Sequence, residues 1–122
     1  MPKKQSFLDE PTGQNKRHLN IVITEANSEN EYLVVPVDTL RFDFQDRSCI
    51  LHAGDHSFIK HDSFVNYKYA RVISYVQLFN GLNKGLFIRK EDISEEVLIR
   101  IQNGARKTKN LKTELKVWFD LF

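Results

Sequence analysis

The order of apolar patterns along the chain is the feature that most restricts its fold. From residue 19 to residue 75, apolar side chains come in short runs broken by polar residues, a pattern typical of β-strands. Beyond residue 92 they recur every four residues, as in a helix that packs on one face. With 122 residues, of which 41% are hydrophobic, the chain has room for one core. The sequence therefore predicts one mainly β (α+β) domain that ends in helices.

The β-like part begins with two runs that turn-forming residues separate. Leu19–Thr24 and Tyr32–Val37 are expected to pair as a hairpin. Asp38–Asp46 is either an edge strand or a folded loop. Further short strands are expected within Ser48–His52, Ser63–Tyr67 and Ala70–Tyr75. Many short strands with few long connections predict a small, strongly curved barrel.

Helix signals are confined to the last third of the chain. Ser74 or a neighbouring residue is expected to cap a short helix that ends near Gly81. Asp92 and Glu95 have the spacing of a capping box, ahead of a longer helix with one apolar stripe. A second helix is expected from Leu111. The sequence thus predicts one or two C-terminal helices.

Composition excludes several classes of protein. Cys49 is the single cysteine, so no disulfide scaffold is possible within the chain. No apolar run approaches the roughly 18 residues that cross a bilayer, and none follows the basic N-terminal residues as a secretion signal requires. We expect a cytoplasmic protein that does not contact membranes.

Charge is distributed unevenly although the net charge is only +2. Cations gather between Arg106 and Lys116, and residues 1–16 are basic, polar and without an apolar period. We expect residues 1–16 to form a flexible arm and residues 17–122 to form the domain. Separated charge can present one basic face to a polyanion, although lysine-rich ends are more often only solvated.

Histidines supply the main candidates for chemistry. His52, His56 and His61 lie within ten residues, but in extended chain His52 and His56 are about 13 Å apart, too far to share a metal ion. The sequence also has no phosphate-binding glycine loop. We therefore expect neither a metal nor a cofactor.

A metal-independent ribonuclease fits these residues better. Cleaving RNA through its own 2′-hydroxyl needs a base, an acid and positive charge against the phosphorane. Histidine titrates in the range that suits either proton transfer, and lysine and arginine supply the charge. The residues that offer this set are Arg17, His18, His56, Lys60 and His61. The competing interpretation is that these histidines are only turn and surface residues.

Three segments resemble the MazF/PemK (Kid-like) toxin ribonucleases of toxin–antitoxin modules. Arg17–Thr24 is similar to their first core strand, which typically reads Arg-Pro-Ala-Val-Val-Leu-Ser. Val34–Thr39 resembles their Val-x-Pro-x-Thr strand, and Ile59–Val65 resembles a later Leu-x-x-x-Ser-x-Val segment. The resemblance covers about residues 17–101. It implies an SH3-like barrel, a homodimer that cleaves single-stranded RNA, and an acidic antitoxin that silences it.

The resemblance also implies which residues act. His18 falls under the family's catalytic arginine, Arg17 stands one residue earlier, and the threonine position falls on Asp38 or Thr39. The expected catalytic residues are His18, His56, Lys60, His61 and Ser63. The expected RNA contacts are Arg17, Thr39, Lys68 and Arg71. The alternatives are a non-catalytic module that binds RNA or protein, and a regulatory subunit of a defence system.

Overall fold

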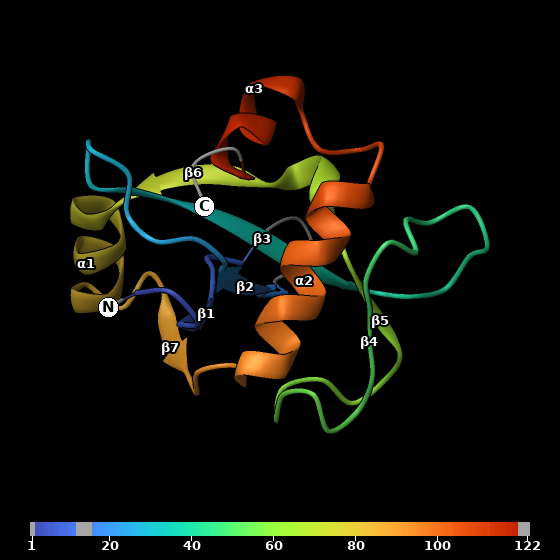
Figure 1. Ribbon diagram of the computed structural model, residues 1–122. Helices are drawn as coiled ribbons and strands as arrows, with labels where there is room; N and C mark the ends of the chain where they lie inside the picture. Colours follow the sequence, from blue (N-terminus) through green and yellow to red (C-terminus); the bar gives the residue numbers. More distant parts are fainter. Residues whose placement is uncertain (1, 12–15, 120–122) are drawn as a thin grey trace.

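The fold is an α+β arrangement in which one antiparallel sheet carries three α-helices (Figure 1). The computed structural model describes residues 2–11 and 16–119. The strands are β1 (Ser6–Leu8), β2 (Leu19–Val22), β3 (Glu31–Thr39), β4 (Ile50–Leu51), β5 (Ser63–Val65), β6 (Arg71–Ser74) and β7 (Ile88–Lys90). The helices are α1 (Tyr75–Asn83), α2 (Glu95–Lys107) and α3 (Thr113–Lys116), with 3-10 turns η1 (Tyr67–Tyr69) and η2 (Val117–Phe119). The predicted β part, the predicted hairpin of β2 with β3 and the C-terminal helices are confirmed.

The sheet is open, so the predicted closed barrel is wrong. Its strand order is β4-β5-β3-β2-β1-β7, and β6 also pairs with β3. The nine-residue β3 pairs with β2 along one edge, while its other edge meets β6 near its start and β5 near its end. β1 and β7 extend the sheet beyond β2, so β7 lies at one end of the strand order and β4 at the other. These two strands do not pair with each other, as they would in a closed barrel. The polar segment after Thr39 is a loop, not an edge strand.

Alternate side chains of β2 and β3 enter two cores. Ile21, Leu33 and Val35 face the cluster that α2 and α3 cover, whereas Val22 and Val34 face the cluster that includes Leu78 of α1. Both faces of these strands are therefore buried, which explains their near-continuous apolar sequence. Figure 1 shows α2 lying across the sheet and α1 beside β7.

Serine caps begin both long helices. Ser74 and Gln77 form a capping box at α1, as the sequence predicts for Ser74. At α2, the Ser94 hydroxyl accepts from the Val97 N–H, so the capping box expected from Asp92 is wrong. Asp92 lies outside the helix and pairs instead with Arg89, 3.4 Å away.

Gly104 lets α2 approach η1 and the residues just before β4 closely. A Cβ there would collide with the Tyr67 hydroxyl and with Cys49. Tyr67 is fully buried and donates its hydroxyl proton to the Ile101 carbonyl over 2.6 Å. Burial raises the pKa of Tyr67 far above its ordinary value, so this donor stays protonated. The glycine is therefore required inside the helix and does not end it.

The N-terminal segment is partly built into the sheet. Ser6–Leu8 is the strand β1, which pairs with β2 on one side and β7 on the other. Ser6 and Phe7 are buried. The expectation of a flexible arm is therefore wrong for this strand, and residues 12–15 lie outside the described residues. Among the described helices, none is long and apolar enough to span a membrane.

Candidate functional site

A cleft of about 750 Å³ opens where β2 begins and β3 ends. His18 and Arg17 form one wall, Asp38 and Thr39 form another, and aromatic rings including Phe42 close the side toward the 40–48 loop. We call this the His18 cleft. Polar and charged groups thus meet in it beside flat apolar surfaces, the mixture that a ligand site requires.

Asp38 anchors the imidazole of His18. The His18 Nε2 lies 3.2 Å from Asp38 Oδ1, and the other carboxylate oxygen accepts a 2.7 Å hydrogen bond from the Asn66 amide. The His18 side chain is 38% exposed, so it is held in place yet still open to the cleft.

This contact selects one form of neutral His18. The Asp38 carboxylate lies at ion-pair distance from Nε2, so it favours the form that carries its proton on Nε2. The lone pair then lies on Nδ1, which bonds to none of the residues that the structure describes. A histidine held in this way by a carboxylate is suited to take a proton from a ligand.

A buried polar chain fixes the backbone beneath His18. Asp9 accepts from the His18 backbone N–H at 2.9 Å and from the Asn20 amide at 3.0 Å. The Asn20 oxygen in turn accepts from Arg71 Nη1 at 2.9 Å. Burial lowers the pKa of Arg71 and the Asp9 carboxylate opposes that effect. Arg71 therefore lies below the cleft, where it supports His18, and does not line it as an RNA contact would.

A side pocket of about 230 Å³ continues the cleft. It shares Asp38 and Thr39 with the cleft and adds Lys60 and His61 from the segment before β5 and Ser63 from the first position of β5. Lys60 and His61 are exposed. The Ser63 hydroxyl donates to the His61 carbonyl at 2.8 Å, so it shapes this wall. The two adjoining pockets are thus lined by residues from all three segments that carry the sequence resemblance.

Cations surround the mouth of the cleft. Lys16, Arg17 and Arg41 all line it. Arg17 uses Nη1 to bond the carbonyls of Asp9 and Leu86, at 3.0 and 2.9 Å. That contact fixes its guanidinium beside the cleft, where the remaining donors can meet an anion.

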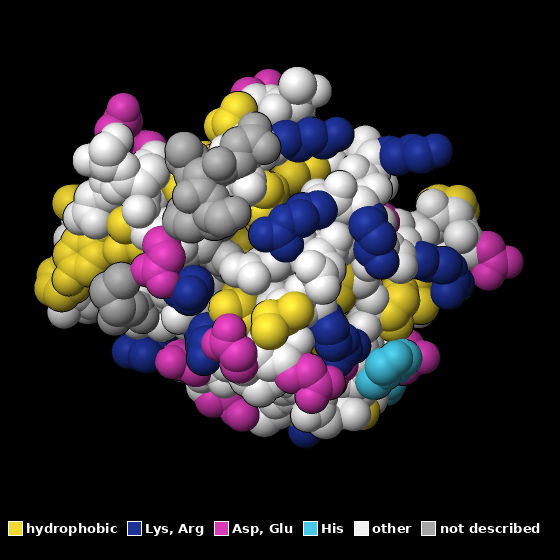
Figure 2. All heavy atoms as spheres, in the orientation of Figure 1, with side chains coloured by type: hydrophobic (Ala, Val, Ile, Leu, Met, Phe, Trp, Pro, Cys, Tyr) yellow, Lys and Arg dark blue, Asp and Glu magenta, His cyan; other side chains and the backbone are white. Residues whose placement is uncertain are grey.

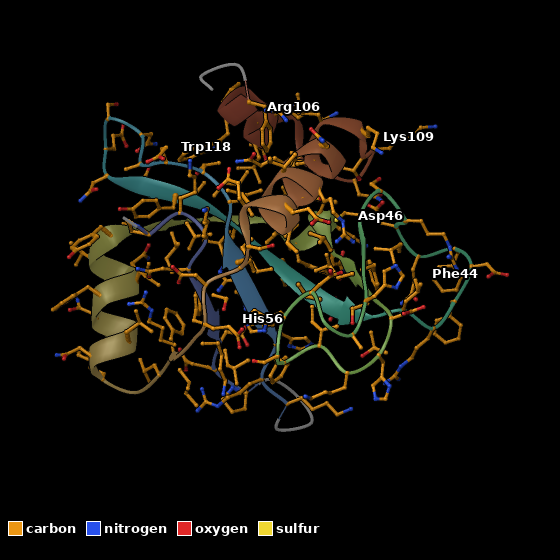
Figure 3. The ribbon with its side chains drawn as sticks, turned by 60° about the horizontal axis from the view of Figure 1, so that its bottom comes forward. Phe44, Asp46, His56, Arg106, Lys109 and Trp118 are labelled. Atoms are coloured by element: carbon orange, nitrogen blue, oxygen red, sulfur yellow. The ribbon has the colours of Figure 1, made fainter. Side chains whose placement is uncertain are left out.

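His56 lies apart from these residues, although it was expected among them. Its side chain is buried, and its Nδ1 accepts from the Phe58 N–H at 3.0 Å. Its Nε2 lies 3.0 Å from the Glu91 carbonyl and 2.9 Å from the Ser6 hydroxyl. Both nitrogens are therefore occupied within the fold. The position of His56 is labelled in Figure 3. The structure assigns His56 a structural position.

Lys68 is the other expected residue that the structure separates from the cleft. It is exposed on η1, with its ammonium 5.7 Å from the ring of Tyr69. Within the described part of the chain, no three His, Cys, Asp or Glu side chains are grouped so that they hold a metal ion.

Sequence reasoning missed the groups that orient His18. The positions of Asn66 and Asp9 in the sequence give no sign that these residues lie near His18. Asn20 offers a signal, because it is a fully buried amide within the apolar strand β2. Such a side chain needs hydrogen-bond partners, and here they are Asp9 and Arg71.

Comparison with known proteins adds no relative at this point. No protein-family model matches the chain, and a search of curated proteins finds no match. The MazF/PemK resemblance therefore stays a prediction from the sequence.

Proposed function

We propose that this protein is a metal-independent endoribonuclease that cleaves single-stranded RNA in the His18 cleft. The observation that carries the proposal is the His18–Asp38–Asn66 arrangement, which holds a partly exposed His18 side chain in a cleft lined by cations. The cleft and its side pocket also bring Arg17, His18, Thr39, Lys60, His61 and Ser63 together, as the resemblance requires.

The proposed reaction uses the RNA's own hydroxyl as nucleophile. His18 Nδ1 takes the 2′-hydroxyl proton, the 2′-oxygen bonds to phosphorus, and the bond from phosphorus to the 5′-oxygen breaks. His61, which lines the side pocket together with Asp38, gives a proton to the departing 5′-oxygen. Lys60 and Arg17 stabilise the extra negative charge on the phosphorane. The products are a 2′,3′-cyclic phosphate and a 5′-hydroxyl end.

The biological role that follows is that of a toxin in a type II toxin–antitoxin module. The sheet, in which β3 pairs with β2, β5 and β6, supports this proposal as an opened relative of the SH3-like arrangement. A homodimer and an acidic antitoxin that covers the cations of the cleft belong to the same proposal. Expression in bacteria is expected to arrest growth, and a small acidic protein encoded next to this one is expected to relieve the arrest.

The second candidate is a non-catalytic module that binds RNA or protein. The contacts of Arg17 favour it, because they commit the arginine beside His18 to two backbone carbonyls. A third, a regulatory subunit of a defence system, has no specific contact in its favour.

The deciding experiment incubates the purified protein with a panel of single-stranded RNAs in EDTA. We expect cleavage that leaves 2′,3′-cyclic phosphate ends, and none where the nucleotide before the cut carries 2′-deoxyribose. Intact RNA across the panel would favour the binding module. Cleavage of the 2′-deoxy substrate would contradict the proposed chemistry.

A further inference from the structure

An aromatic and basic surface adjoins the His18 cleft and is not needed for the chemistry proposed there. The rings of Phe42 and Phe44 in the 40–48 loop are stacked, with centroids 5.3 Å apart and planes only 8° from parallel. Both are exposed, at 53% and 85%. We call this pair the Phe42–Phe44 platform. Two large parallel rings in water are unusual unless something covers them.

Hydrogen bonds hold the platform in one shape. The Gln45 side-chain oxygen accepts from the backbone N–H groups of Arg41 and Phe42, at 2.6 and 2.9 Å. Gln45 in turn donates its own backbone N–H to the Phe42 carbonyl at 3.2 Å. The rings are thus presented by an ordered turn, which lowers the entropic cost of binding a ligand on them.

Asp46 fastens this loop to the turn between α2 and α3. Its Oδ2 accepts from the Thr108 hydroxyl at 2.5 Å and from the Asn110 amide at 3.0 Å. Figure 3 shows Phe44 at the outer end of the loop and Asp46 beside the end of α2, near Lys109. The loop that carries the platform is therefore tied, through Asp46, to the basic end of α2.

The neighbouring cations are available to a ligand. Lys107, Lys109 and Lys112 are exposed, and none of them forms an ion pair with a residue in the described ranges. In Figure 2, Lys and Arg side chains gather on the side where α2 ends and the loop projects. The surface thus joins stacked rings to positive charge.

We propose that this surface binds the part of a single-stranded RNA that extends beyond the His18 cleft. The inference rests on the proposed function for the RNA's path, since Phe42 belongs to both the platform and the cleft wall. Unpaired bases stack on the two rings, and the three lysines contact the phosphates that follow. An acidic peptide would satisfy the lysines, but it has no flat group to match parallel rings.

Binding is measured apart from cleavage, with a fluorescent 12-nucleotide 2′-O-methyl RNA that cannot be cut. Phe44→Ala is expected to weaken its affinity about tenfold, because stacking on an exposed ring is lost. Lys109→Ala is expected to reduce the slope of log affinity against log salt by about 0.7. A 4-nucleotide RNA of the same chemistry covers fewer phosphate contacts, so Lys109→Ala is expected to change its salt slope less than that of the 12-nucleotide RNA.

Phe79→Ala is the matched control. Tyr75 and Phe79 are also an exposed stacked pair, 6.2 Å apart, but they lie on α1, which carries no acidic or basic side chain in its first or last turn. We expect this variant to bind the 12-nucleotide RNA normally.

Three results would overturn the inference. They are an unchanged affinity in Phe44→Ala, an equal loss in Phe79→Ala, or tighter binding of a poly-glutamate peptide than of RNA at the same site. If the protein binds the 12-nucleotide strand through Phe44 but cuts no RNA, the proposed function fails while this inference stands.

Discussion

His18 and His56 are the same side chain in two regions that use it differently. His56 is buried, and both of its nitrogens have partners inside the protein. His18 is half-buried and lines the cleft, with its Nε2 3.2 Å from Asp38 and its Nδ1 bonded to none of the described residues. The comparison teaches that hydrogen-bond satisfaction, more than residue type, separates a histidine that can exchange protons from one that stabilises a fold.

The largest expected effect is on the rate of RNA cleavage by His18→Ala. Loss of the proposed base is expected to lower the single-turnover rate by about 100-fold or more. The unfolding midpoint in urea is expected to change little, because the His18 contacts with Asp9 run through its backbone. His52→Ala is the control, since His52 is an exposed histidine paired with Asp62 away from the cleft. An equal loss of cleavage rate in His18→Ala and His52→Ala would contradict the role proposed for His18.

The opposite pattern is expected for His56→Ala. Removing this imidazole leaves the Phe58 N–H without its acceptor and takes one of two partners from the buried Ser6 hydroxyl, which still donates to the Glu91 carbonyl. The free energy of unfolding, measured by urea titration, is expected to fall by about 1–3 kcal/mol. The cleavage rate per folded molecule is expected to stay within about twofold of wild type. A stable but inactive His56→Ala protein would show that His56 takes part in the reaction.

Asp38→Asn sharpens the account of His18. The amide can present its NH₂ to Nε2, which moves the imidazole proton to Nδ1 and removes the base. Single-turnover cleavage is expected to slow by at least about tenfold while RNA affinity, measured by anisotropy, is retained. Asn66→Ala is expected to have a smaller effect in the same direction, because the carboxylate keeps its contact with His18. A full rate in Asp38→Asn would rule out selection of the tautomer by Asp38.

The smallest expected effect concerns the loop that Asp46 fastens. Partial burial raises the pKa of Asp46, but hydrogen bonds from Asn110, Ser48 and Thr108 lower it further than burial raises it. A lowered pKa in the folded state means that ionised Asp46 adds stability above about pH 4, which is lost as the pH falls through the folded value. Asp46→Asn is therefore expected to unfold at lower urea concentration than wild type at pH 6. The difference between the two urea midpoints is expected to become smaller below about pH 4. A difference that stays constant with pH would contradict this prediction.

Strands and helices with a local sequence signal could be predicted. The pairing of strands that are far apart in the sequence, which decides whether the sheet closes into a barrel, could not. The alternation in Leu19–Thr24 and the Ser74 cap depend on neighbours in the chain, and both predictions are confirmed. The open sheet depends on β1, only three residues long, whose place between β2 and β7 is set by partners far along the chain. No local pattern encodes such pairing.

The residues of the candidate site also fall into those that the sequence could predict and those that it could not. The segment resemblance placed His18, Lys60 and His61 around one groove, and the structure lines adjoining pockets with them. It also included His56, because a sequence cannot show that the Phe58 N–H and the Glu91 carbonyl occupy its nitrogens. Those partners come from a tight turn and from a strand end 35 residues away.

Chemical rescue tests most directly whether His18 transfers a proton. Imidazole added to His18→Ala is small enough to enter the 750 Å³ cleft and can replace the missing base. The account predicts that the cleavage rate of this variant rises with imidazole concentration, while wild type and Asp38→Asn respond little. Failure of imidazole to raise the rate, or an equal rise in wild type, would contradict the claim that His18 is the base.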